Sequence, residues 1–218
     1  MEGPNPASIL RNSVVVTCGA LVLLKMMPLL QLSPLAISVL LLVGTISAVG
    51  GALVATAQVD LKRAFSYSTT SYLGLVFIAI ALQQPFIALL LLFCHGLAKA
   101  LLFATTNCQD LTELGGLGTR MPATTSAFLV ASAALTGVVP LGCFWCFGLL
   151  VEGLRPQSPL FAAVVLLTNG LTAFNQVRVY RQVFLGQPHP KTRRAPEVNW
   201  LMALPMVSLM VVVLVLPW

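Results

Sequence analysis

Two side chains that can carry a proton lie four residues apart inside the apolar stretch FCHGLAKALLF, residues 93–103. They are His95 and Lys99, and on a helix this spacing places them on the same face. A lysine at the centre of a bilayer costs about 2.5–3.5 kcal/mol on insertion scales, so it normally faces a bundle interior or a wet cavity. Desolvation disfavours the charged form of a buried lysine and histidine titrates near neutral pH, so the pair predicts a proton relay. The alternative is a lysine that snorkels to the membrane edge beside a histidine bonded within the core.

The composition predicts the surroundings of this pair. Of the 218 residues, 58% are hydrophobic and 8% are charged, whereas a soluble domain usually has about 25% charged residues. We therefore expect an all-α polytopic membrane protein, folded as a single transmembrane helical bundle over residues 1–218. The net charge of +6 does not indicate nucleic-acid binding, because the basic residues lie singly or in short connections between apolar runs.

Apolar runs of about 20 residues, long enough to cross a bilayer as helices, predict about seven spans. They are residues 9–27, 35–57, 67–82, 86–103, 121–150, 160–184 and 200–218. Seven spans place most basic residues on one side: Lys62, Arg63, Arg120, Arg181, Lys191, Arg193 and Arg194, with Arg11 near the same face. Lys25 and Arg155 fall on the other side. By the positive-inside rule, the first span then begins on the cytoplasmic or stromal side.

The fifth span contains a motif that interrupts helices, TGVVPLGCFWCFG, residues 136–148. Pro140 and Gly142 free backbone carbonyls, which protein or water must then satisfy. Broken helices of this kind form ion or substrate sites in transporters, although a simple proline kink explains the motif equally well. Cys143 and Cys146 form a C-x-x-C pair without a second set of ligands, so we expect neither a metal site nor a redox centre in this chain.

The entrance of the third span is polar, QVDLKRAFSYSTTSYLG, residues 58–74. Its charged residues Asp60, Lys62 and Arg63 are typical of an interface anchor. The hydroxyl groups of residues 67–71 either line a hydrated path or bond to the backbone of their own helix.

Four segments in this order, MEGPNPAS, VDLKRAFSYSTTSYLG, HGLAKALLF and LTELGGLGTRMP, resemble the proton-translocating, antiporter-like membrane subunits of complex I. The resemblance is closest to the NdhF-type distal subunit of cyanobacterial and chloroplast NDH complexes. It implies about fourteen core helices in two inverted repeats, each with a broken helix, of which this chain resembles the eighth to fourteenth. We therefore expect the first repeat and the C-terminal lateral helix to be missing. We also expect missing residues between Phe103 and Ala104, where the family helix continues for about two more turns.

The resemblance assigns roles to individual positions. Lys99 matches the central-channel lysine of the family, His95 its neighbouring histidine, and Lys62 a lysine near the channel entrance. Two segments depart from the family pattern. SILRNSVV stands where the family commonly reads ALIHAATM, so Asn12, beside Arg11, replaces a relay histidine. FWCFGL stands where it commonly reads FWSKDE, so Phe147 replaces an exit-channel lysine and the usual exit is in doubt.

These departures, with RNSVVVTCG, are similar to the variants found in cyanobacterial CO2-uptake complexes. That resemblance implies a multi-pass subunit of the thylakoid membrane, with other NDH membrane subunits and a hydrophilic CO2-hydrating protein as partners. It also implies that plastoquinone and iron–sulfur clusters belong to other subunits, with no cofactor in this chain. The alternatives are an ordinary respiratory or cyclic-flow subunit, a subunit of a multi-subunit cation/proton antiporter, and a purely structural module.

Overall fold

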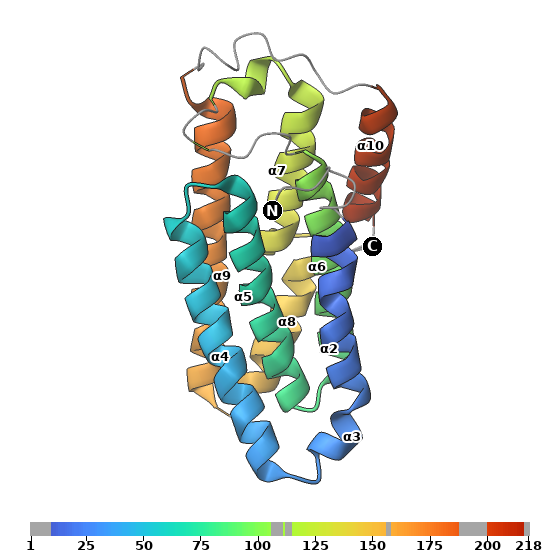
Figure 1. The fold of residues 1–218 in the computed structure, drawn as a ribbon, viewed down its shortest axis with the longest axis vertical. Coiled ribbons are helices and arrows are strands. Elements are labelled where there is room, and N and C mark those ends of the chain that lie inside the picture. Colours follow the sequence, from blue (N-terminus) through green and yellow to red (C-terminus); the bar gives the residue numbers. More distant parts are fainter. Residues whose placement is uncertain (1–9, 106–110, 112–114, 156–157, 188–199, 216–218) are drawn as a thin grey trace.

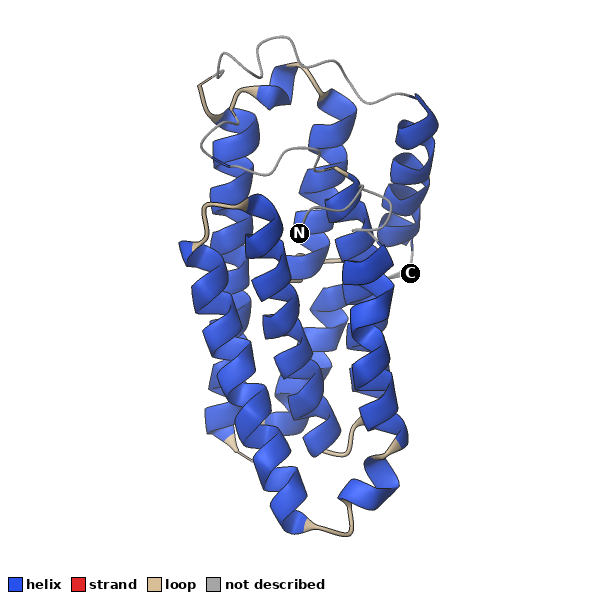
Figure 2. Ribbon diagram, in the orientation of Figure 1, coloured by secondary structure: helices blue, strands red, loops and turns tan. Residues whose placement is uncertain are grey.

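The computed structural model describes residues 10–105, 111, 115–155, 158–187 and 200–215, and within these ranges the regular structure is helical throughout (Figures 1 and 2). The long helices run side by side in one bundle. In chain order the helices are η1 (Arg11–Val15), α2 (Val16–Lys25), α3 (Met27–Leu30), α4 (Pro34–Ala57), α5 (Leu61–Ala81), α6 (Pro85–Ala104), η3 (Leu117–Thr119), α7 (Pro122–Thr136), α8 (Gly142–Leu154), α9 (Pro159–Tyr180), η4 (Arg181–Leu185) and α10 (Trp200–Val215).

The helix lengths agree with a chain that crosses a membrane about seven times. Four helical segments are long and apolar enough to cross a bilayer on their own: α4, α5, α6 and the continuous run of α9 and η4. Shorter apolar helices supply the other passages, namely residues 13–25, the pair α7 and α8, and the part of α10 from residue 203 to 215. The all-α polytopic fold predicted from the sequence is therefore confirmed.

Local chemistry decides where these helices begin. Proline occupies the first position of α4, α6, α7 and α9, where its missing N–H is not needed. Asp60 caps α5, because its carboxylate accepts the amide N–H of Arg63 at 3.1 Å. This cap starts the helix at Leu61, so the predicted start of the third span at residue 67 was wrong by six residues.

The predicted break in the fifth span is confirmed. The helix α7 ends at Thr136, and Gly137 follows with a left-handed φ of +69°, a conformation that favours glycine. The chain continues through Pro140, and α8 begins at Gly142. The two half-helices lie one after the other along the bundle (Figure 1).

Helices α5 and α6 form the centre of the bundle, and most of their side chains are buried. By contrast, α4 and α9 expose large apolar side chains such as Leu42, Ile46 and Phe174, as expected for surfaces that face lipid. The contact between α4 and α5 is very close. A Cβ atom on Gly74 would lie 2.5 Å from the backbone nitrogen of Ala48, so the two backbones meet through small residues.

The ends of the bundle reproduce the predicted charge asymmetry. The first turn of α5, the last turns of α6 and α9 and the first turn of α7 lie at the same end of the bundle (Figure 1). That end, here called the basic end, carries Lys62, Arg63, Arg120 and Arg181. Lys25 and Arg155 lie at the ends of α2 and α8, at the opposite end. The predicted basic residues at positions 191, 193 and 194 lie outside the described residues.

Helix α6 passes through Phe103 and Ala104 without interruption. The amide N–H of Thr105 donates to the carbonyl of Leu101 at 3.3 Å, across the position where missing residues were expected. Within the given sequence α6 is therefore continuous at this point, and the expectation that residues are missing here stays a prediction.

Candidate functional site

Lys99 lies in the interior of the bundle and does not reach the membrane edge. It has 0% exposure, although it is only five residues from the end of α6. Its Nζ donates to the carbonyl oxygen of Phe65 at 2.9 Å and to the hydroxyl oxygen of Ser68. The alternative of a snorkelling lysine is therefore wrong for this structure, because α5 supplies acceptors inside the protein.

The partners of Lys99 are neutral. Among the described residues, the buried charged side chains are Lys62 and Lys99, and the one ion pair joins the surface residues Arg63 and Asp60 at 3.8 Å. The ring of Phe65 adds a cation–π contact, with its centroid 5.4 Å from Nζ. Because no described carboxylate holds the ammonium group, Lys99 can lose its proton without leaving an unpaired buried anion behind.

Most hydroxyl groups at the start of α5 bond to the helix that carries them. Those of Ser68 and Thr69 both donate to the carbonyl of Phe65 at 3.0 Å, and Thr70 donates to the carbonyl of Ser66 at 3.3 Å. Ser71 instead donates to the carbonyl of Ala48 on α4 at 2.6 Å. Of the two predicted alternatives, backbone bonding accounts for most of these hydroxyls, while Ser68 also accepts the Lys99 ammonium.

His95 is 1% exposed, and both of its ring nitrogens lack a hydrogen-bond partner among the described residues. Its ring stacks on Tyr72, with the centroids 4.3 Å apart and the planes at 25°. Hence the sequence correctly placed His95 and Lys99 in the same buried region, but the structure shows no direct hydrogen bond between them. The proton transfer between these residues stays a prediction.

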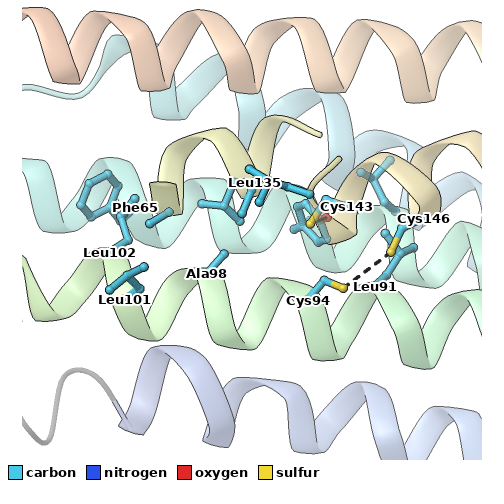
Figure 3. Close-up of a cluster of buried hydrophobic side chains, with 14 of the residues drawn as sticks. Phe65, Leu91, Cys94, Ala98, Leu101, Leu102, Leu135, Cys143 and Cys146 are labelled. Atoms are coloured by element: carbon cyan, nitrogen blue, oxygen red, sulfur yellow. Dashed lines mark hydrogen bonds between the residues drawn. The ribbon is translucent and has the colours of Figure 1, made fainter. Parts of the chain in front are cut away.

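Cysteine side chains lie at the contact between α8, the second half of the broken helix, and α6, which carries Lys99. Gly142, the first residue of α8, is so close to α6 that a Cβ atom on it would lie 2.9 Å from the Sγ of Cys94. The Sγ atoms of Cys94 and Cys146 are 3.9 Å apart (Figure 3), and the hydroxyl of Tyr72 donates to the Sγ of Cys143 at 2.9 Å. All three cysteines are free thiols, and the described residues contain no cluster of ligands suited to a metal ion.

Phe147, one residue after Cys146 on α8, places a buried apolar ring next to these thiols. The ring is 7% exposed and contacts Tyr72 edge-on, with the centroids 5.8 Å apart. The position where the resemblance would place an exit lysine is therefore occupied by a packed aromatic side chain.

Aromatic side chains from four helical segments separate Lys99 from the basic end. Phe65 packs against Phe103 and Phe128, with centroid distances of 5.6 and 6.2 Å. Phe128 in turn contacts Tyr180 and Phe184, at 6.3 and 5.1 Å. This aromatic cluster, formed by Phe65, Phe103, Phe128, Tyr180 and Phe184, offers few polar groups between Lys99 and the basic end.

The other predicted site residues lie elsewhere in the structure. Lys62 is buried in the first turn of α5, with 5% exposure, and its role near the channel entrance stays a prediction. Arg11 is exposed at the start of η1, and the side chain of Asn12 lies outside the described part of the structure. None of these three residues is bonded to Lys99 in the part of the chain that the structure describes.

Sequence reasoning missed a buried polar group on α9. Asn175 and Gln176 are 1% and 2% exposed, and Ser132 on α7 donates to the Oε1 of Gln176 at 3.3 Å. Arg178 lies one turn further along α9. Its guanidinium donates to two carbonyls at the end of α4, that of Thr56 and, at 2.5 Å, that of Gln58. The signal was present in the segment TNGLTAFNQVR, residues 168–178, where six polar or charged side chains interrupt a span that was otherwise interpreted as apolar.

Comparisons with known proteins agree with this architecture. Residues 1–172 match the family described as "NADH:quinone oxidoreductase/Mrp antiporter, TM". The chain is 68% identical to NAD(P)H-quinone oxidoreductase subunit 5, organellar chromatophore 2, of Paulinella chromatophora, over 100% of this chain and 36% of that protein. It is 34% identical to the chloroplastic subunit 5 of Citrus sinensis, over 85% of this chain and 27% of that protein.

These alignments also bear on the length of the chain. The chain spans only about a third of the length of these curated relatives. The alignment with the Paulinella protein covers 225 positions, seven more than the 218 residues of this chain, so that relative has additional residues within the matched region. Their placement next to Phe103 stays a prediction.

Two solved structures share the fold at low sequence identity. One is the membrane-bound sulfane sulfur reductase, an archaeal respiratory membrane complex, with a TM-score of 0.86 and 21% identity over 97% of this chain and 39% of that chain. The other is the Mrp complex from a Dietzia species, with a TM-score of 0.75 and 19% identity over 83% of this chain and 44% of that chain. Together with the family match, these findings show that the chain belongs to the antiporter-like membrane proteins of the NADH:quinone oxidoreductase/Mrp family.

Proposed function

We propose that this chain translocates protons as part of an NdhF-type membrane subunit in a photosynthetic NDH complex. Electrons would reach plastoquinone through iron–sulfur clusters in other subunits, and the chain described here would carry the proton. The observation that carries the proposal is Lys99, which is fully buried in a membrane-spanning helix and held by two neutral oxygens. An intramembrane lysine placed in this way is typical of an ion pathway rather than of a structural anchor.

Each residue around Lys99 has a role in this proposal. Lys99 takes up and releases the proton, while Ser68 and the carbonyl of Phe65 accept hydrogen bonds from its charged form. His95, one turn away on α6, exchanges protons with Lys99 through water, because its two unpartnered ring nitrogens are free to bind it. Lys62, buried near the basic end, is proposed as a further position near the channel entrance.

The break between α7 and α8 supplies the movable part. The residues from Gly137 to Leu141 interrupt the helix next to the buried thiols and Tyr72, so a small shift of α8 changes the surroundings of His95 without unwinding a complete helix. Pro140 and Gly142 are the residues that maintain this break.

The finer form of the proposal is a complex that couples plastoquinone reduction to the conversion of CO2 to bicarbonate, in a cyanobacterial thylakoid membrane. It is supported by Arg11 and Asn12 in place of the usual histidine segment, and by Phe147 in place of an exit lysine. A bound hydrophilic CO2-hydrating protein in the purified complex distinguishes this form from an ordinary respiratory or cyclic-flow complex.

A subunit of a multi-subunit cation/proton antiporter is the second candidate. The fold similarity to the Mrp complex favours it, whereas the 68% identity to a quinone oxidoreductase subunit favours the first candidate. Co-purification of this chain with quinone-reducing subunits decides between them.

The test of proton translocation uses Lys99→Ala in the complete complex, in sealed membrane vesicles. We expect proton uptake driven by quinone reduction to be lost while the complex remains assembled. The matched control is Lys25→Ala, which removes an exposed lysine at the end of α2 and should leave uptake unchanged. Wild-type uptake in the Lys99→Ala complex would rule out the proposed function.

A further inference from the structure

The interface between α7 and α9 contains buried amide groups without partners. Neither the Oδ1 nor the Nδ2 of Asn175 has a hydrogen-bond partner among the described residues, and the same holds for the Nε2 of Gln176. Both side chains are nine-tenths or more buried, at 1% and 2% exposure. The described contact to this pair is the hydroxyl of Ser132, which donates to the Oε1 of Gln176 at 3.3 Å.

The neighbouring threonines on α9 behave differently. Thr168 and Thr172 are also buried, but each hydroxyl donates to a carbonyl of its own helix, at 2.8 and 2.9 Å. A hydroxyl can satisfy itself in this way, whereas an amide group has two donors and an acceptor that extend beyond the helix backbone. Asn175 and Gln176 therefore differ from these threonines. Asn169, whose Oδ1 also lacks a partner among the described residues, lies on the same helix but is less buried.

Water is the ligand that fits these groups. Within a membrane no bulk solvent satisfies buried polar groups, so an amide left unpaired there is unfavourable. Buried waters in proteins typically bond to about three such groups, and this interface offers the amide of Asn175, the amide of Gln176 and the hydroxyl of Ser132. We propose that Ser132, Asn175 and Gln176 bind water between α7 and α9, and that this water continues the proton path that begins at Lys99.

A series of side-chain contacts connects Lys99 with the site formed by Ser132, Asn175 and Gln176. The carbonyl of Phe65 accepts the Lys99 ammonium, and the ring of Phe65 packs against Phe128 on α7. Ser132 lies one turn after Phe128 on the same helix and bonds to Gln176. After the break, the ring of Phe147 on α8 packs against Tyr72, so α8 offers an aromatic ring at this position while α9 offers polar groups.

The position of the water site indicates that the proposed path leads toward the basic end of the bundle. Asn175 lies one turn before Arg178, whose guanidinium bonds to the last carbonyls of α4. Arg181 follows at the exposed basic end of α9. The site therefore lies between the interior of the bundle and the basic end, beside the aromatic cluster that covers Lys99. This inference rests on the proposed function, since it extends the path of the same proton.

The experiment combines a high-resolution electron cryomicroscopy map of the intact complex with transport by variants in vesicles. Asn175→Leu and Gln176→Met keep the side-chain size but remove the amides, and Thr172→Val is the matched control on the adjacent turn. We expect ordered water density next to Asn175 and Gln176. Proton uptake should fall about tenfold in each amide variant, since each removes a hydrogen bond that holds the water, and should be unchanged in Thr172→Val. Gln176→Ser, which keeps a hydroxyl that water can bond, should retain more uptake than Gln176→Met.

The outcomes separate this inference from the proposed function. If the double variant Asn175→Leu/Gln176→Met transports protons at the wild-type rate while Lys99→Ala does not, the water path is wrong and the role of Lys99 stands. Water density without any effect of the variants on uptake also overturns the path, because the water is then only structural. Amides that bond to protein atoms in the map, with no water beside them, exclude the site. If Lys99→Ala itself transports protons, the proposed function fails.

Discussion

The hydrogen bond between Ser68 and Lys99 allows a quantitative prediction. The structure gives the Nζ of Lys99 two acceptors, and Ser68→Ala removes one of them while leaving the carbonyl of Phe65 at 2.9 Å. A hydrogen bond to a charged group contributes about 1.5–3 kcal/mol. Because about 1.4 kcal/mol corresponds to a factor of ten, the population of protonated Lys99 relative to neutral Lys99 should fall by about tenfold or more. Proton uptake should therefore slow by about tenfold under conditions in which protonation of Lys99 is the rate-limiting step.

The assay measures proton uptake into sealed vesicles that contain the complete complex, at a matched rate of quinone reduction. Thr69→Val is a suitable control. Thr69 is also buried, and its hydroxyl donates to the same carbonyl of Phe65 at 3.0 Å, but it is not bonded to Lys99. The control should transport protons at close to the wild-type rate. Ser68→Thr keeps the hydroxyl and should recover most of the activity lost in Ser68→Ala.

Two results would refute this reasoning. If Ser68→Ala and Thr69→Val slow proton uptake equally, the effect comes from disturbance of the start of α5 and not from the bond to Lys99. If Ser68→Ala transports at the wild-type rate, the ammonium does not depend on this hydroxyl, and the geometry described here is not the one that loads the proton.

Three further predictions concern the framework around the site. Gly74→Leu should destabilise the purified complex by about 1–3 kcal/mol, read as a lower Tm, because its Cβ would lie 2.5 Å from the backbone of α4. Gly50→Ala, whose Cβ meets nothing within 4 Å, should leave the Tm unchanged. Arg178→Leu removes the hydrogen bonds to the end of α4 and should lower the Tm, whereas the exposed Arg181→Leu should not. Phe147→Lys should reduce the amount of assembled complex without increasing proton uptake. A lysine at the centre of a span costs about 2.5–3.5 kcal/mol. At this buried position the new lysine would face the ring of Tyr72, and no acidic side chain among the described residues is seen to pair with it.

The sequence predicted the parts of the fold that depend on composition and on local chemistry. Apolar runs predicted the spans, Pro140 and Gly142 predicted the broken helix, and the placement of basic residues predicted the common end of the bundle. These features follow from properties of short segments, so no tertiary contact has to be known. The start of α5 was misplaced because the charged residues after Asp60 were taken for an anchor, although the Asp60 cap continues the helix through them.

The candidate site was predictable in its membership but not in its contacts. The spacing of His95 and Lys99 placed both on one face of α6, and the structure buries both. It did not reveal that Ser68 and Phe65 hold the ammonium, since these contacts depend on how α5 is rotated against α6. For the same reason, Asn175 and Gln176 were overlooked, because their burial follows from the packing of α9 on α7 and not from their own segment.

The most direct test of the account is the number of protons moved per electron delivered to quinone in Lys99→Arg and Lys99→Met complexes. Lys99→Arg keeps a positive charge in the bundle but cannot release it, because a guanidinium group is not deprotonated in proteins. Lys99→Met keeps an unbranched side chain without a charge. If Lys99 works by binding and releasing a proton, both complexes should move fewer protons per electron than the wild type, to a similar extent. A wild-type ratio in the Lys99→Arg complex would contradict this account, because a fixed charge would then be sufficient.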